Sequence, residues 1–204
     1  MGGGADSRIP RILQESPDLR RADLEVVVRT YSFEPEEGAA QIARWREELQ
    51  PMLVIGESLG AIQAIRLRGV PHLLISPALG APRWLGWLAP LTLIPGVPAL
   101  MGWLYKPREG ERQRMSFRFR VVSQYRRHLR LALDNTPRKG STDAFFAFFG
   151  RRDHYRRSGV VSLRMWRKWF GSDYILYDGS HFMEENYIQE LLIPKIIEMF
   201  QNNC

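Results

Sequence analysis

Short apolar runs alternate with longer amphipathic stretches along this chain. Five runs have the length and the β-branched or apolar content of strands, and they cover residues 24–33, 51–56, 72–75, 144–149 and 174–177. Apolar residues at helical spacing lie around them, at about 9–14, 36–50, 59–68, 160–170 and 183–200, the last restarting at Pro194. This alternation predicts an α/β fold with a mostly parallel central sheet and helices on both faces.

The composition is that of an ordinary globular protein. The 204 residues are 45% hydrophobic and 25% charged, which suits a single domain over residues 1–204 and excludes collagen-like or wholly disordered chains. The one cysteine, Cys204, excludes an intrachain disulfide framework and a cysteine-only zinc cluster. We expect no metal and no cofactor. The first residues lack the basic-then-apolar pattern of a secretory signal, so we expect a cytoplasmic protein.

An uncharged segment interrupts the alternation between two predicted strands. Residues 84–105 carry no charge over twenty-two positions, which is long enough to span a bilayer. Pro90, Pro95 and Pro98 break its helical ladder, and a single crossing would separate two strands of one sheet. We therefore predict an apolar cap, within an insertion at about residues 80–140, that covers a pocket or touches a membrane peripherally.

The positive charge is concentrated directly after this apolar segment. Residues 106–139 hold eleven basic and three acidic residues, a surplus of eight within a chain whose net charge is +7. Such a stretch is typical of a solvated face, a surface for anionic lipid, or a site that attracts anionic substrates. No zinc finger, helix-turn-helix or aromatic RNA-binding motif accompanies it, so we expect no nucleic-acid partner.

The candidate chemistry lies in Gly56-Glu57-Ser58-Leu59-Gly60, which has the pattern G-x-S-x-G. It follows an apolar strand and opens a helix, where a sharp turn exposes the serine and the flanking glycines avoid collisions with backbone. With this motif the chain resembles the α/β-hydrolase family of small serine esterases and lipases. The resemblance implies that Ser58 is the nucleophile and that the backbone N–H of Leu59 is one oxyanion donor.

The resemblance also implies an acid and a histidine, in that order after the serine. His181 follows the last predicted strand, where the family keeps its catalytic histidine, and Asp153 follows the strand before it. His154 is the reserve base, and Asp178 is a competing acid that is better explained as a turn residue. Asp143 lies at the opposite end of its strand, about 20 Å away.

Two other histidines have structural explanations. His72 enters a buried strand and is expected in the core or at a strand edge. His128 lies in the arginine-rich segment and is expected to be solvated.

The amino terminus departs from the family pattern. Gly3 and Gly4 resemble the glycine-rich loop that supplies the second oxyanion N–H, but no strand precedes them. The absent strand would lie between residues 24–33 and 51–57, and its loss would leave a gap of about 10 Å. We expect the native protein to have further apolar residues before Gly2. The alternative is that the two flanking strands close up directly.

Two functions compete on this scaffold. The first is a serine hydrolase that cleaves a carboxylic ester or thioester of a small molecule through an acyl-enzyme on Ser58. Trp84, Trp87 and Trp103 in the cap would then bind the acyl or aromatic group of the substrate. The second is a non-catalytic or membrane-associated binding protein, because fold does not fix function.

Overall fold

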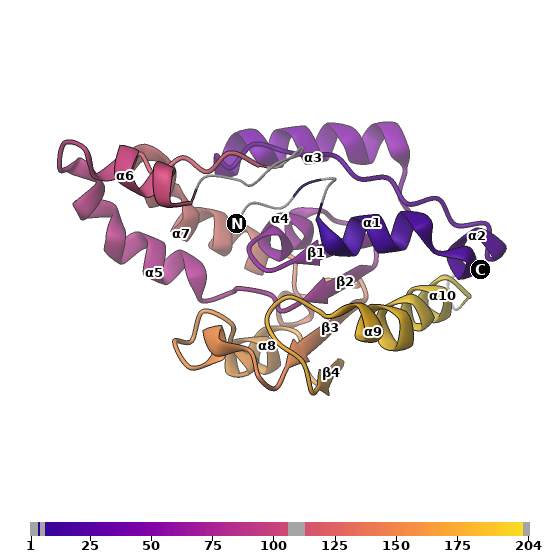
Figure 1. Cartoon of the computed structure of the whole chain (residues 1–204). Coiled ribbons are helices and arrows are strands. Elements are labelled where there is room, and N and C mark those ends of the chain that lie inside the picture. Colours follow the sequence, from indigo (N-terminus) through magenta and orange to yellow (C-terminus); the bar gives the residue numbers. More distant parts are fainter. Residues whose placement is uncertain (1–3, 5–6, 106–112, 202–204) are drawn as a thin grey trace.

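The fold is built on a four-stranded parallel sheet with strand order β1-β2-β3-β4 (Figure 1). The computed structural model describes residues 4, 7–105 and 113–201. The strands are β1 (Val54–Glu57), β2 (His72–Ile75), β3 (Phe145–Gly150) and β4 (Tyr174–Tyr177). Four of the five predicted strands are thus confirmed, and those at 72–75 and 174–177 have the predicted bounds.

Helices follow or separate the strands. The α-helices are α1 (Arg8–Glu15), α2 (Pro17–Arg21), α3 (Pro35–Leu49), α4 (Gly60–Arg66), α5 (Ala81–Leu88), α6 (Val97–Leu104), α7 (Phe119–Leu133), α8 (Leu163–Trp169), α9 (Glu185–Tyr187) and α10 (Ile193–Gln201). Short helical turns are η1 (Ala89–Leu93), η2 (Pro137–Lys139), η3 (His154–Arg156) and the π-helical turn η4 (Ile188–Leu192). The predicted break near Pro194 corresponds to this π-helical turn, after which α10 begins.

Two apolar layers enclose the sheet, because alternate residues of a strand face opposite sides. Leu73 and Ile75 of β2 pack with α1, α2 and α10 on one face. Leu74, between them, packs with α4, α7 and α8 on the other face. The predicted arrangement, a parallel sheet with helices on both faces, is therefore confirmed (Figure 1).

The strand predicted over residues 24–33 is wrong. Residues 24–32 belong to no helix or strand, although the side chains of 24–28 alternate between half-buried and exposed, as they would in a strand. No described residue pairs with them in a ladder, however, and β1 is the edge strand of the sheet. A cavity lies between this segment and β1 and is lined by Val26, Val28 and Val54, among others. The alternating burial was therefore predictable, but pairing requires a neighbour that this segment lacks among the described residues. The absent strand stays a prediction.

The insertion forms a cap at one end of the molecule. α5, η1 and α6 follow one another there, and α7 leads back to the sheet (Figure 1). α5 packs against Arg126 of α7 so closely that a Cβ at Gly86 would lie 2.1 Å from the guanidinium group. No helix that the described residues form is both long and apolar enough to cross a membrane.

Candidate active site

Ser58 lies on a strained turn between β1 and α4. Its φ of +52° is in the left-handed region that L-residues seldom adopt. Its backbone N–H donates to Ile75 O at 2.9 Å, which fixes the turn to β2. A Cβ at Gly56 would lie 2.8 Å from the Cα of Ala61, so only glycine fits at that position. The turn therefore lifts the Ser58 side chain above the carboxyl end of the sheet, where open α/β sheets place their sites.

Three side chains from separate elements meet at this end of the sheet. The Ser58 hydroxyl donates to His181 Nε2 at 2.9 Å, and His181 Nδ1–H donates to Asp153 Oδ2 at 2.9 Å. Asp153 follows β3 and His181 follows β4, so β1, β3 and β4 each contribute one group. The Asp153 carboxylate is fully buried and the His181 ring is 3% exposed. The structure thus brings together the three residues that the sequence nominated, with the connectivity of a nucleophile, a base and an orienting acid.

Neighbouring groups hold Asp153 and His181 in place. The backbone N–H of Tyr155 donates to Asp153 Oδ1 at 2.8 Å, and the Tyr155 ring lies edge-on to His181 at 4.6 Å. Glu184 accepts a bond from Ser180 N at 3.0 Å and thereby closes the loop that carries His181. The sequence reasoning missed Tyr155, although its place two residues after Asp153 fits a side chain–backbone turn.

The competing residues lie elsewhere. Asp143 accepts from Gly69 N at 3.0 Å, at the opposite end of β3 from Asp153. Asp178 is exposed and lies 3.5 Å from Arg152. The ring of His154 is 6.3 Å from that of His181 and packs against the Tyr155 ring at a tilt. None of the three touches Ser58.

The expectation that His128 is solvated is wrong. His128 is fully buried on the inner face of α7, and its Nδ1 lies 2.9 Å from the Arg66 guanidinium. Burial, with a smaller contribution from Arg66, lowers the pKa of His128 to about 3. The ring therefore accepts a bond from Arg66 as a neutral group. His72 is buried as expected and stacks on Phe145.

Of the candidate oxyanion donors, the described residues leave only one N–H free. The N–H of Leu59 is at the start of α4, where helix N-termini leave donors free, and it makes no hydrogen bond to another described residue. The Gly4 N–H donates to Ser7 Oγ at 2.9 Å, so this bond must break before Gly4 can bind an oxyanion. Gly3 lies outside the described residues. The assignment of both glycines stays a prediction.

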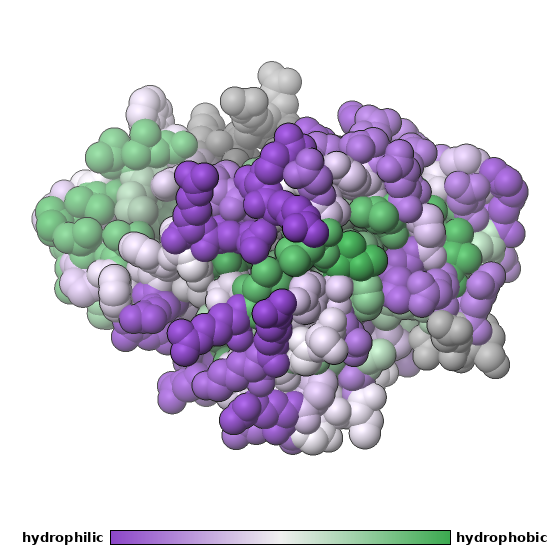
Figure 2. All heavy atoms as spheres, turned by 90° about the horizontal axis from the view of Figure 1, so that it is seen from below, coloured by the Kyte–Doolittle hydropathy of each residue, from purple (hydrophilic) through white to green (hydrophobic). Residues whose placement is uncertain are grey.

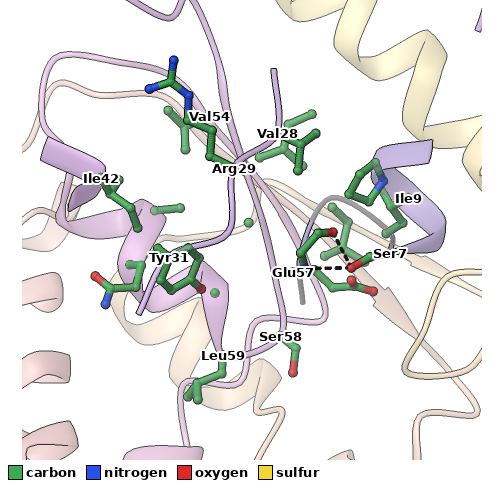
Figure 3. Close-up of a pocket in the computed structure, with 18 of the residues that line it drawn as sticks. Ser7, Ile9, Val28, Arg29, Tyr31, Ile42, Val54, Glu57, Ser58 and Leu59 are labelled. Atoms are coloured by element: carbon green, nitrogen blue, oxygen red, sulfur yellow. Dashed lines mark hydrogen bonds between the residues drawn. The ribbon is translucent and has the colours of Figure 1, made fainter. Parts of the chain in front are cut away.

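A large apolar cavity leads to Ser58. Its volume is about 1310 Å³, and it runs from Ser58 past the cap and along β1. Figure 3 shows the part that lies beside Ser58 and β1. Trp84 lines the cavity together with Leu85, Leu88 and Met101. Trp87 and Trp103 are exposed and do not line it, so their contact with substrate stays a prediction. Among the described residues, no cluster of His, Cys, Asp and Glu is arranged to hold a metal ion.

Glu57 also lines the cavity, and the sequence reasoning did not single it out. It precedes Ser58, and Figure 3 shows its side chain beside Ser7. Burial raises the pKa of Glu57 to about 7, and the nearby His181 and Arg8 oppose that rise. The x position of the motif accepts any residue, so the sequence gives no sign that Glu57 is buried. Its burial becomes visible only in the structure.

Glu57→Gln is expected to stabilise the protein above pH 7. The folded protein retains a proton on Glu57 between its ordinary pKa of 4.5 and about 7, whereas the unfolded chain releases it. The free energy of unfolding of the wild type therefore falls as the pH rises through this range. Glutamine removes this loss, which we put on the order of 2 kcal/mol because the cavity admits some water.

Urea unfolding at pH values below 4.5 and above 7 measures this effect. The gain in unfolding free energy from Glu57→Gln should vanish below pH 4.5. Glu25 is exposed, so Glu25→Gln is the control and should change the unfolding free energy little at either pH. An advantage of equal size at both ends would contradict the assigned environment of Glu57.

Comparison with known proteins identifies the fold. No known family model and no curated protein sequence matches this chain. Among solved structures, the chain is similar to one described with LipS and LipT, two metagenome-derived lipolytic enzymes. The TM-score is 0.61 and the identity 17%, covering 96% of this chain and 88% of the other.

A second similar structure is a monoacylglycerol lipase of Paleococcus ferrophilus, with a TM-score of 0.58 and 16% identity. The match covers 95% of this chain and 88% of the lipase. At such low identity the likeness concerns the backbone alone. Together with the parallel sheet and the turn at Ser58, it shows that this chain has the α/β-hydrolase fold.

Proposed function

We propose that this protein is a serine hydrolase that cleaves a carboxylic ester or thioester. The observation that carries the proposal is the hydrogen-bonded chain from Ser58 through His181 to Asp153, with both bonds at 2.9 Å. A serine hydroxyl becomes a useful nucleophile only when a base removes its proton and a third group orients that base. The fold of the two lipolytic neighbours is consistent with this chemistry.

The reaction begins with attack of Ser58 Oγ on the carbonyl carbon of the ester. His181 Nε2 accepts the hydroxyl proton, and Asp153 stabilises the imidazolium through Nδ1–H. The carbonyl oxygen becomes an oxyanion that accepts a hydrogen bond from Leu59 N–H. The C–O bond then breaks, and His181 gives its proton to the leaving alcohol. Water, deprotonated by His181, attacks the acyl-serine ester and releases the carboxylic acid together with free Ser58.

The cavity favours an apolar acyl group as the substrate part nearest the cap. Leu85, Leu88 and Met101 line it beside Trp84, and none of these side chains offers a charge to bind. Thioesters share the carbonyl chemistry and fit the same proposal. The partner is thus a small-molecule ester, and the cytoplasmic location stays a prediction from the sequence.

Labelling with a fluorophosphonate tests the proposal directly. The reagent phosphonylates a serine only when a base activates it, so we expect a stable adduct that peptide mass mapping places on Ser58. Ser58→Ala is the control and should remain unlabelled while retaining the wild-type circular dichroism spectrum.

The alternative function is binding without catalysis on the same scaffold. Wild-type protein that is folded but stays unlabelled would favour this alternative, since its Ser58 would lack activation. The occupied N–H of Gly4 is the observation that supports it, because an incomplete oxyanion hole slows turnover by on the order of 100-fold or more.

A further inference from the structure

The cap exposes an apolar surface that the proposed reaction does not require. Fifteen large hydrophobic side chains of the described residues are exposed, and nine of them lie between Trp84 and Leu104. We call these nine the cap patch. Figure 2 shows apolar residues gathered at the left end of the molecule, which α5 and α6 occupy in Figure 1. Exposed apolar surface that gathers in one place marks an interaction site.

α6 is the most exposed part of the cap patch. None of its eight residues is buried, although its sequence, VPALMGWL, contains no polar side chain. Trp103 is 71% exposed and Leu104 is 60% exposed. A helix that is apolar on every side is normally covered by protein or lipid. The described residues leave α6 uncovered, which is the state in which such a helix favours binding to a partner or to lipid.

The charge of the cap indicates the chemistry of that partner. Residues 81–105 and 113–133 contain seven arginines and no acidic residue, and all seven arginines are exposed. None of them forms a salt bridge with a described residue. Arginine binds phosphate through paired N–H groups, and basic side chains beside an apolar patch favour anionic bilayers.

The cap patch is also continuous with the mouth of the cavity. Trp84 and Leu88 are exposed on the cap and at the same time line the cavity that reaches Ser58. A lipid surface that covers the patch would therefore lie at the entrance through which an ester reaches the serine.

We propose that the cap docks on the surface of an anionic lipid bilayer. The apolar side chains of η1 and α6 enter the headgroup region. The exposed arginines of α7, together with Arg118 directly before it, bind lipid phosphates. The cap lies on the membrane and does not cross it. Delivery of a lipid ester from this surface to Ser58 rests in addition on the proposed hydrolase function.

Sedimentation with vesicles tests the docking independently of catalysis. The probes are vesicles of equal parts phosphatidylcholine and phosphatidylglycerol, compared with vesicles of phosphatidylcholine alone, at low and high salt. We expect the protein to sediment with the anionic vesicles, and we expect high salt to weaken this binding because it screens the arginines. Leu100→Ser/Leu104→Ser should lower the partition coefficient by about tenfold or more, since α6 would lose its apolar contact.

Two controls make the outcomes distinct. Met52→Ser removes a similarly exposed side chain outside the cap and should bind vesicles like the wild type. Fluorophosphonate labelling of Leu100→Ser/Leu104→Ser without lipid should match the wild type, so loss of docking is distinguished from loss of the active serine.

Equal sedimentation with neutral and anionic vesicles, or none with either, would overturn the proposal. So would gel filtration that shows a dimer which the α6 double variant dissociates, because the cap patch would then bind a second copy of the chain.

Discussion

Replacing His181 by alanine is expected to lower kcat for a p-nitrophenyl ester by about 10⁶-fold. The imidazole is the one base within hydrogen-bond distance of Ser58 Oγ among the described residues, and it lies almost wholly inside the protein. Without it the hydroxyl keeps its proton, and no described group can return a proton to the leaving alcohol. The measurement is steady-state hydrolysis compared with the wild type, with thermal unfolding as a check on folding.

His154→Ala is the matched control for that experiment. His154 is a neighbouring, exposed histidine whose ring packs against Tyr155 and makes no hydrogen bond to Ser58. We expect its kcat to stay within about tenfold of the wild type, as is usual for a surface change outside the reacting groups. A large loss in His154→Ala combined with an active His181→Ala would instead identify His154 as the base.

Asp153→Asn is expected to lower kcat by about 10⁴-fold while preserving the fold. The amide is similar in size, and its oxygen can still accept the bond that Tyr155 N donates to Oδ1. Its NH₂ group then faces His181 Nδ1 and favours the tautomer whose proton is on Nε2. That proton points at Ser58, so the ring can no longer accept the hydroxyl proton.

Asp178→Asn distinguishes this effect from a general loss of charge near the site. Asp178 is the other carboxylate close to His181 in sequence, but its side chain is 71% exposed and pairs loosely with Arg152. Exposed pairs of this kind contribute little, so kcat should be close to that of the wild type. The assignment fails if Asp153→Asn keeps kcat within tenfold, or if Asp178→Asn is the more damaged variant.

The parts of the fold that the sequence predicted are those determined by local pattern. β2 and β4 are short apolar runs that end at polar or turn-forming residues, so their bounds could be read directly. Residues 24–32 have an equally good strand pattern, but a ladder depends on a neighbour that is remote in sequence. The structure places a cavity there, and no local signal reports a cavity.

The site residues also separate into those that a local sequence pattern indicates and those that depend on the fold. Ser58, Asp153 and His181 were found because each follows a predicted strand within a pattern of known chemistry. Glu57 was missed because the groups that surround it come from elements far away in the chain. Tyr155 was missed although its bond to Asp153 is local, because its contact with the His181 ring depends on the fold. The burial of His128 could have been predicted from the sequence. Apolar residues recur around it at helical spacing and share with it the buried face of α7, namely Val121, Tyr125 and Ala132. The many arginines around His128 led instead to the prediction of a solvated segment.

The open edge of β1 has a consequence for handling the protein. Val54 N and Ser58 N donate to residues next to or in β2, so the intervening Ile55 and Glu57 turn their amides away from the sheet. No described residue accepts from those amides. Unpaired strand edges recruit other extended chains and seed aggregates. We therefore expect concentrated samples to aggregate through intermolecular strand pairing at this edge, and a charged or proline-bearing substitution there should reduce that aggregation.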